Sequence, residues 1–331
     1  MEVTDLLALA LKAGASDMHL AAGQAPAMRV HGVLQRLPVP MATPDDLMRS
    51  MESLLDADPY RQWAAGHDLD VALELPALGR FRVNLFRQMN GPALTVRLIP
   101  ARIACAEALG LGEIVRTTGR YRDGLVLIGG PTGSGKTSTL AALLDQMGRE
   151  RALHIVTLED PIEVVHASHQ GVVNQREIGR DCCSFAQGLR SALRQDPDVI
   201  VLGELRDLET IRLALRAAET GHLVLATVHT RSAVNTVDRV VEVFPAQEKP
   251  WVRAMLADSL RVVVAQVLVG RRGGGRGAAR GGLVVNDAAR NLIREGRMAQ
   301  LHSVMQTGAA EGMQTLAGAM KQLQAGGLLA E

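Results

Sequence analysis

The chain has 331 residues, of which 47% are hydrophobic and 2% aromatic, and its formal net charge is +1. This length and apolar content predict two domains with aliphatic cores, and the near-neutral charge argues against a nucleic-acid-binding surface. No CxxC pair occurs among Cys105, Cys182 and Cys183, which argues against a disulfide framework and a four-cysteine zinc site. We expect a reducing cytoplasm, no signal peptide and no membrane-spanning helix, because no apolar run reaches ~18 residues.

Residues 1–98 predict a small α/β domain. Apolar periodicity indicates helices over residues 3–13 and 44–65, and short strands over 16–20 and 27–37. An α/β domain of this size has room for one small sheet with helices packed on it.

Two further strands of this domain are predicted by alternation. The stretch GRFRVNLFRQ (79–88) alternates strictly between apolar and polar residues, which is typical of a half-buried strand with Arg82 on the polar face. The stretch ALTVRL (93–98) repeats the pattern and puts Arg97 on the polar face. The two arginines are therefore expected at the surface of the sheet.

The rhythm of the sequence changes at residue 124, after a connector that spans residues 99–123. In residues 124–331 the apolar runs LVLI, LHIVTL, VIVL and LVLATV alternate with helical stretches, which predicts a parallel sheet with crossover helices. The last ~65 residues are expected to be helical apart from one glycine-rich loop, RRGGGRGAARGG. This run has no aromatic residues for base stacking, so we expect a mobile loop rather than a nucleic-acid-binding segment.

A complete phosphate-binding loop lies between an apolar strand and a predicted helix. Its glycines allow backbone N–H groups to converge on phosphates, and the helix N-terminus adds positive potential. Lys136 can reach the β- and γ-phosphates of ATP, and the hydroxyl of Thr137 can bind Mg²⁺. The residues expected to bind the nucleotide here are Gly130, Pro131, Thr132, Gly133, Ser134, Gly135, Lys136 and Thr137.

Acidic and histidine residues follow the next strands. The stretch VTLEDPIEVVH places Glu159 and Glu163 just beyond a strand, and VIVL is followed by Gly203 and Glu204 rather than by the usual aspartate. The strand LVLATV lies between His222 and His229. In open α/β sheets ligands bind at the carboxyl ends of the strands, so we expect Glu204, Glu159 and His229 near the nucleotide.

Together these motifs resemble the secretion-ATPase superfamily of type II secretion and type IV pili, and within it the pilus retraction ATPases. The resemblance extends over nearly the whole chain and rests on GASDMHL, GPTGSGKT, EDPIE, ALRQDPDVIVLGELRDLETIRLAL, AAETGHLVLATVHT, DRVVEVFP and ARNLIRE. It implies a RecA-like P-loop ATPase core with a smaller N-terminal PAS-like α/β domain. It also identifies the four motifs of the family: the P-loop, an acidic "Asp box", a Gly-Glu motif and a "His box".

The resemblance also implies roles for these residues. Glu204 would organise Mg²⁺ and its water, with Thr137 as the other protein ligand, and an Asp-box glutamate would activate the attacking water. We favour Glu163 as that base over Glu159, and the sequence leaves the choice open. His229 would act as a sensor near the γ-phosphate, and His222 is a further nucleotide-site candidate although its strand end should face away. Arg82 and Arg97 would complete the site of an adjacent subunit, with local pairing to acidic residues as the alternative.

The implied assembly is a homohexamer that hydrolyses ATP and moves the inner-membrane platform protein of a type IV pilus, causing pilus depolymerisation and twitching motility. We expect a cytoplasmic protein that is peripheral at the inner membrane through that partner, with a paralogous retraction ATPase as a second candidate partner and no nucleic acid.

The alternatives are a motor of a type II secretion or conjugative transfer system and a nucleotide-binding accessory paralogue. Two departures from the family, Arg280-Gly281-Gly282 in place of His-Glu and an apolar residue and AARN in place of AIRN, affect the C-terminal region.

Overall fold

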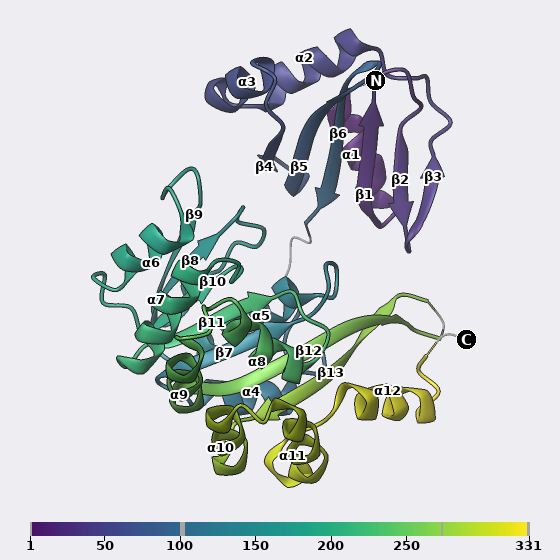
Figure 1. The fold of residues 1–331 in the computed structure, drawn as a ribbon. Helices are drawn as coiled ribbons and strands as arrows, with labels where there is room; N and C mark the ends of the chain where they lie inside the picture. Colours follow the sequence, from purple (N-terminus) through teal and green to yellow (C-terminus); the bar gives the residue numbers. More distant parts are fainter. Residues whose placement is uncertain (1, 100–102, 273, 330–331) are drawn as a thin grey trace. The chain divides into compact units, whose positions relative to one another are not determined.

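The computed structural model describes residues 2–99, 103–272 and 274–329, and the chain divides into two compact units (Figure 1). The first unit is Met1–Arg102 with Pro161–Val164, and the second is Ile103–Asp160 with Val165–Glu331. Pro161–Val164, the second half of the Asp box, groups with the first unit, which no local sequence pattern predicts.

The first unit is built on one antiparallel sheet with the strand order β3-β2-β1-β6-β5-β4. Its strands are β1 Ala15–Ala21, β2 Ala27–Val30, β3 Val33–Arg36, β4 Leu69–Leu75, β5 Gly79–Gln88 and β6 Gly91–Leu98. Its helices are α1 Val3–Lys12, α2 Pro44–Leu54 and α3 Ala57–Ala64.

The single helix expected over residues 44–65 is wrong, because two helices occupy this stretch. Thr43 caps α2 by accepting a hydrogen bond from the Asp46 N–H, and α2 ends where Leu55 adopts an extended conformation with φ −99° and ψ 144°. Asp56 is also extended and lies at the N-cap of α3. The break allows Trp63 on α3 to be fully buried in the core of this unit.

The alternation expected in β5 is confirmed. Phe81, Val83 and Leu85 are buried, while Arg82, Asn84 and Phe86 alternate with them and are more exposed. The apolar face packs with Trp63 in one aliphatic and aromatic core.

The second unit contains a mostly parallel sheet with the strand order β13-β12-β7-β11-β10-β8-β9. Its strands are β7 Gly124–Gly129, β8 His154–Glu159, β9 Val172–Glu177, β10 Val199–Leu202, β11 Leu223–Val228, β12 Leu260–Gly270 and β13 Arg276–Val284. The longer helices are α4 Gly112–Gly119, α5 Lys136–Glu150, α6 Phe185–Ala192, α7 Leu208–Glu219, α8 Ala233–Glu242, α9 Lys249–Ser259, α10 Asp287–Glu295 and α12 Leu316–Ala325. The short ones are η1 Met298–Gln300, α11 Leu301–Thr307 and η2 Gly308–Glu311.

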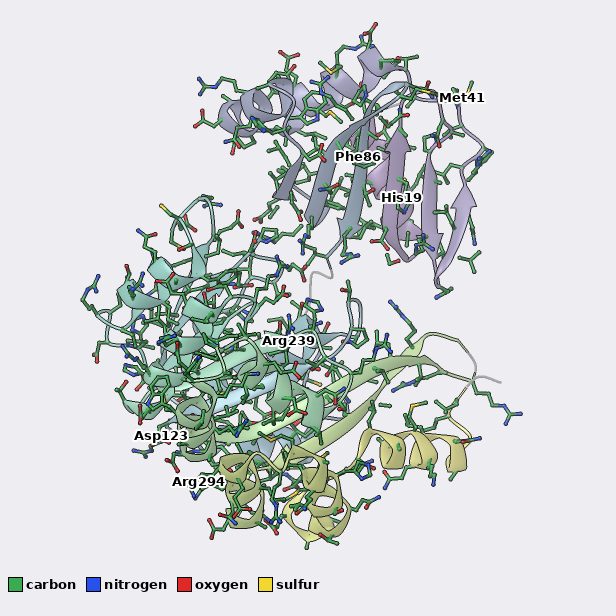
Figure 2. All side chains as sticks on the ribbon, in the orientation of Figure 1. His19, Met41, Phe86, Asp123, Arg239 and Arg294 are labelled. Carbon is green, nitrogen blue, oxygen red and sulfur yellow. The ribbon has the colours of Figure 1, made fainter. Side chains whose placement is uncertain are left out.

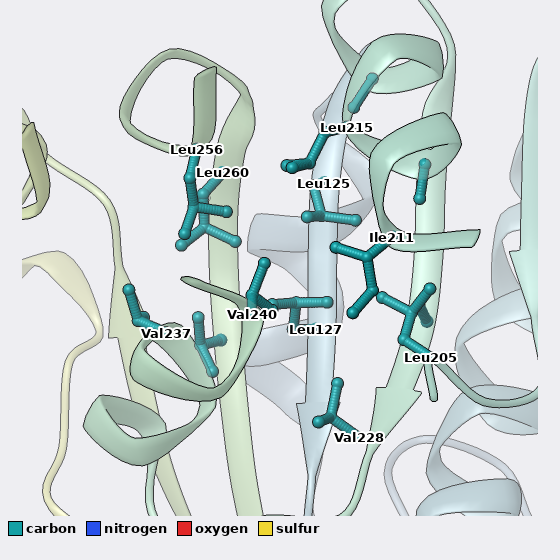
Figure 3. Packing of buried hydrophobic residues seen from close by; sticks show 14 of the residues in the cluster. Leu125, Leu127, Leu205, Ile211, Leu215, Val228, Val237, Val240, Leu256 and Leu260 are labelled. Carbon is teal, nitrogen blue, oxygen red and sulfur yellow. The ribbon is translucent and has the colours of Figure 1, made fainter. Parts of the chain in front are cut away.

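The central strand β7 is buried along its whole length, as expected for a parallel strand covered on both faces. Leu125 and Leu127 pack with residues of α7 and α8, such as Ile211 and Val240 (Figure 3). Val126 and Ile128 pack with the apolar face of α5 on the other side of the sheet. The strand therefore holds the phosphate loop, which follows it directly, on a rigid support.

The expectation of helices and a mobile glycine-rich loop near the C-terminus is wrong in part. Most of RRGGGRGAARGG lies in β13, which pairs with β12 in an antiparallel hairpin. At Gly281 an added Cβ would lie 2.7 Å from the backbone N of Leu316, so only glycine allows the chain to pass so close. The Gly282 N–H donates to the Gln314 carbonyl at 2.8 Å, and the return bond is 3.0 Å. Glycine and alanine have low strand propensity, which explains why the pattern was read as a loop.

Helix α10 carries the ARNLIRE motif. Ile293 of this helix is fully buried, whereas two arginines of the motif contact α9. Arg290 Nε donates to the Ala257 carbonyl at 3.1 Å. Arg294, which is labelled in Figure 2, forms an ion pair with Asp258 at 2.7 Å. These two arginines therefore link α10 to α9. Within the part of the chain that the structure describes, no helix is long and apolar enough to cross a membrane.

Candidate nucleotide-binding site

The phosphate loop connects the end of β7 to the start of α5. Gly135 lies at the N-cap of α5 in the left-handed region, with φ 87° and ψ 21°, a conformation that costs glycine little and other residues more. The helix begins at Lys136, so the first N–H groups of α5 have no partner inside the helix. A loop of this form provides backbone donors and a helix N-terminus for an anionic ligand.

Lys136 is 8% exposed and its ammonium group is turned onto the loop. The Nζ atom donates to the carbonyl oxygens of Gly130 at 2.8 Å and Pro131 at 3.1 Å, and it lies 3.5 Å from Nδ1 of His229. A buried ammonium group needs such acceptors, because desolvation of a charge is costly. The ammonium group of Lys136 therefore lies against the backbone of the phosphate loop.

Glu204 follows Gly203 at the end of β10, and the side chains of Arg206 and His229 lie beside its carboxylate. Oε1 lies 3.1 Å from Nε2 of His229, and Oε2 lies 2.7 Å from the guanidinium of Arg206. Burial alone would raise the pKa of Glu204, but the hydrogen bonds and charges of Arg206 and His229 outweigh it and lower the pKa below its usual value. Glu204 is therefore a carboxylate at neutral pH.

Glu159 is the last residue of β8 and is held by its neighbours in the sheet. Its Oε1 accepts hydrogen bonds from the Thr157 hydroxyl at 2.6 Å and from Nε2 of Gln175 at 2.9 Å. Strands β7, β11, β10 and β8 are parallel neighbours, so the phosphate loop, His229, Glu204 and Glu159 share the carboxyl edge of one sheet.

His222 lies at the opposite edge of that sheet, which is a correction to its place among the nucleotide-site candidates. It precedes β11, and its carbonyl accepts a hydrogen bond from the N–H of Gly124, where β7 begins. Its Nδ1 is 3.2 Å from the Ala217 carbonyl. Six strand residues separate His222 from His229, which corresponds to about 20 Å along the strand.

Glu163, Arg82 and Arg97 belong to the first unit. Arg82 forms ion pairs with Asp70 at 2.6 Å and with Glu163 at 3.0 Å, and the hydrogen bond to Asp70 is the main cause that raises its pKa. Arg97 forms an ion pair with Asp17 at 3.1 Å and is 50% exposed. Both arginines thus have the local acidic partners that the sequence offered as the alternative to a role in an adjacent subunit.

Gln266 is a residue of the phosphate-loop environment that motif matching missed. It lies on β12, is 1% exposed and contacts the backbone of Ser134 and the side chain of Thr139. The signal was present in the sequence, because Gln266 is the single polar side chain within VVVAQVLVG. A lone amide within an apolar strand needs partners, and here the partners are in the loop.

Comparison with known proteins shows to which family the chain belongs. Residues 2–317 match the family described as Type II/IV secretion system protein. The Type IV pilus retractation ATPase PilT of Pseudomonas aeruginosa is 48% identical over 99% of this chain and 96% of its own length. The Twitching motility protein of Neisseria gonorrhoeae is 45% identical over 92% of this chain and 82% of its own.

A crystal structure described as the pilus retraction motor PilT with bound ADP superposes with a TM-score of 0.90 and 40% identity, covering 100% of this chain and 95% of that one. The chain therefore belongs to the type II/IV secretion system protein family, and it is an ATPase with a RecA-like core. The resemblance to pilus retraction ATPases drawn from the sequence motifs is confirmed by these relatives.

Proposed function

We propose that this chain is a homohexameric motor that hydrolyses ATP and powers type IV pilus retraction at the inner membrane. The observation that carries this proposal is the arrangement at one sheet edge, where Glu204 contacts His229 and His229 lies beside Lys136 of the phosphate loop. The similarity to retraction ATPases supports the pilus as the system that the motor serves.

In this proposal the phosphate loop and Lys136 bind the phosphates of ATP, and Thr137 and Glu204 provide oxygen atoms for Mg²⁺. The donor set suits Mg²⁺, which is usually held by one or two carboxylates together with substrate phosphates and water. Bound Mg²⁺ would neutralise phosphate charge during hydrolysis.

The activation of water is assigned to the Asp box. We keep Glu163 as the first candidate base, with Glu159 as the alternative. Oε1 of Glu163 accepts a hydrogen bond from Arg82, and Oε1 of Glu159 accepts hydrogen bonds from Thr157 and Gln175, so the choice between them rests on replacing each in turn. A base must be free to accept a proton from water. Separate replacement by glutamine distinguishes them, because the base variant should lose turnover while the other variant keeps most of it.

The oligomer would complete each site across a subunit boundary. Arg82 or Arg97 of one subunit would approach the phosphates bound by its neighbour, after exchange of their present acidic partners. Cycles of ATP binding and release would then open and close the boundaries and turn the platform protein that the ring contacts. A paralogous retraction ATPase is a second proposed partner.

Deletion of the gene in its host tests this function. Loss of the motor should leave surface pili in place or increase them and should abolish twitching, and wild-type protein but not Lys136→Ala protein should restore motility. Normal twitching together with a defect in protein secretion or DNA transfer would instead assign the chain to one of those systems.

A further inference from the structure

Gln266 occupies an unusual place for an amide. It lies in the middle of β12, where its strand neighbours Val264 and Ala265 are fully buried, and it is itself 1% exposed. An amide at such a position is tolerated when both its donor and its acceptor are used. The question is which groups use them.

Both ends of the Gln266 amide bind the phosphate-loop region. Nε2 donates to the carbonyl oxygen of Ser134 at 2.7 Å, and Oε1 accepts from the hydroxyl of Thr139 at 2.8 Å. Ser134 is 2% exposed and Thr139 is 1% exposed, so water does not compete for these bonds. The side chain of Gln266 therefore connects β12 both to Ser134 in the phosphate loop and to Thr139 in the first turn of α5.

The bond to Ser134 fixes the orientation of one peptide group. In a planar trans peptide the C=O and the following N–H point in opposite directions. Because the Ser134 carbonyl points to Gln266, the N–H of Gly135 points away from β12. The loop is also packed closely against this amide, since a Cβ on Gly135 would lie 3.3 Å from Nε2. Backbone N–H groups of such loops are the donors that bind phosphate.

We propose that Gln266 is a positioning residue for phosphate binding, which orients the Ser134–Gly135 peptide through its side-chain amide. This inference rests on the proposed nucleotide-binding function of the loop. Gln266 lies 132 positions from Ser134 in the sequence. It would contribute to the affinity for nucleotide phosphates and not to the chemical step. Gln266 does not itself contact the ligand in this account.

Two variants separate positioning from a merely structural contribution. Gln266→Leu removes both hydrogen bonds at similar volume. Gln266→Glu keeps an acceptor for Thr139, but its ionised carboxylate would face the Ser134 carbonyl, whereas its protonated form could donate to it. Burial raises the pKa of a carboxyl group, so the protonated form should be reached on mild acidification.

Ser259→Ala is the matched control, because it removes a buried polar group just before β12. ADP affinity is measured by calorimetry, with the thermal midpoint of the nucleotide-free protein recorded beside it. Gln266→Leu should weaken ADP binding about tenfold, or about 1.4 kcal/mol, within the range for a lost buried hydrogen bond. Ser259→Ala should bind ADP as wild type does.

The ratio of the ADP affinity of Gln266→Glu to that of wild type should be closer to one at pH 5.5 than at pH 8. Taking this ratio at each pH removes the effect of the titration of ADP itself. If Gln266→Leu does not fold, the pH dependence of ADP binding by Gln266→Glu tests the proposal by itself. The proposal is overturned if Gln266→Leu binds ADP as tightly as wild type, or if the Gln266→Glu ratio is the same at both pH values. Failure of wild-type protein to bind ADP would contradict the proposed function instead.

Discussion

His229 connects Glu204 to Lys136: its Nε2 lies 3.1 Å from Oε1 of Glu204 and its Nδ1 lies 3.5 Å from Nζ of Lys136. An imidazole in this position lies between the acidic and basic ends of the candidate site. Replacement of Glu204 thus changes one member of a contact network and leaves the loop that binds phosphate in place.

Glu204→Gln should keep ATP binding and lose hydrolysis, because it preserves shape and removes the charge that organises the metal and the water. A positioned acid–base group contributes ~10²–10⁴-fold in rate, so turnover should fall by that order. Single-turnover kinetics and nucleotide titration measure the two effects separately. A rate within about threefold of wild type would be too small for such a role and would redirect attention to Glu159 and Glu163.

Arg97 should act on the nucleotide of an adjacent subunit. Mixed rings of Arg97→Ala and Lys136→Ala protein contain some boundaries at which both residues are intact, so mixing should recover part of the ATPase activity. The measurement is turnover over the full range of mixing ratios after subunit exchange has been demonstrated. No recovery at any ratio would leave Arg97 with only its pairing to Asp17.

His166 should make the fold sensitive to mild acid. Its ring Nδ1 is buried with no hydrogen-bond partner among the described residues, and burial lowers its pKa to about 4, against a smaller opposing effect of Asp145. An unfolded histidine titrates near ~6.5. Between those values the unfolded chain binds more protons, so stability is lost as pH falls from ~6.5 towards 4.

His166→Phe should reduce this loss, which urea unfolding at pH 7.5 and pH 5 measures. The exposed His302 gives a control, since His302→Phe should leave the difference between the two pH values as in wild type. An equal loss of stability in wild type and His166→Phe would show that burial of this ring does not cause the acid sensitivity.

Local motifs predicted which residues share the carboxyl edge of the parallel sheet better than they predicted the rest of the molecule. The phosphate loop, Glu204 and His229 each follow a short apolar run, and parallel strands necessarily bring such positions to one edge. The hairpin of β12 and β13 was missed because its second strand is rich in glycine and alanine, which have low strand propensity, and because the Gly281 backbone packs against Leu316, which is far away in the sequence. The Arg82–Glu163 ion pair and the bond between Gln266 and Ser134 join residues 81 and 132 positions apart, which no local pattern encodes.

ATP turnover by this chain should depend on the phosphate loop. The most direct test of this dependence is the steady-state rate of phosphate release from Mg²⁺-ATP by wild-type and Lys136→Ala protein at equal concentration. The wild-type protein should turn over ATP only with Mg²⁺. Lys136→Ala should not turn it over, because the charge that binds the β- and γ-phosphates is lost. Hydrolysis by Lys136→Ala at the wild-type rate would show that turnover does not depend on the phosphate loop.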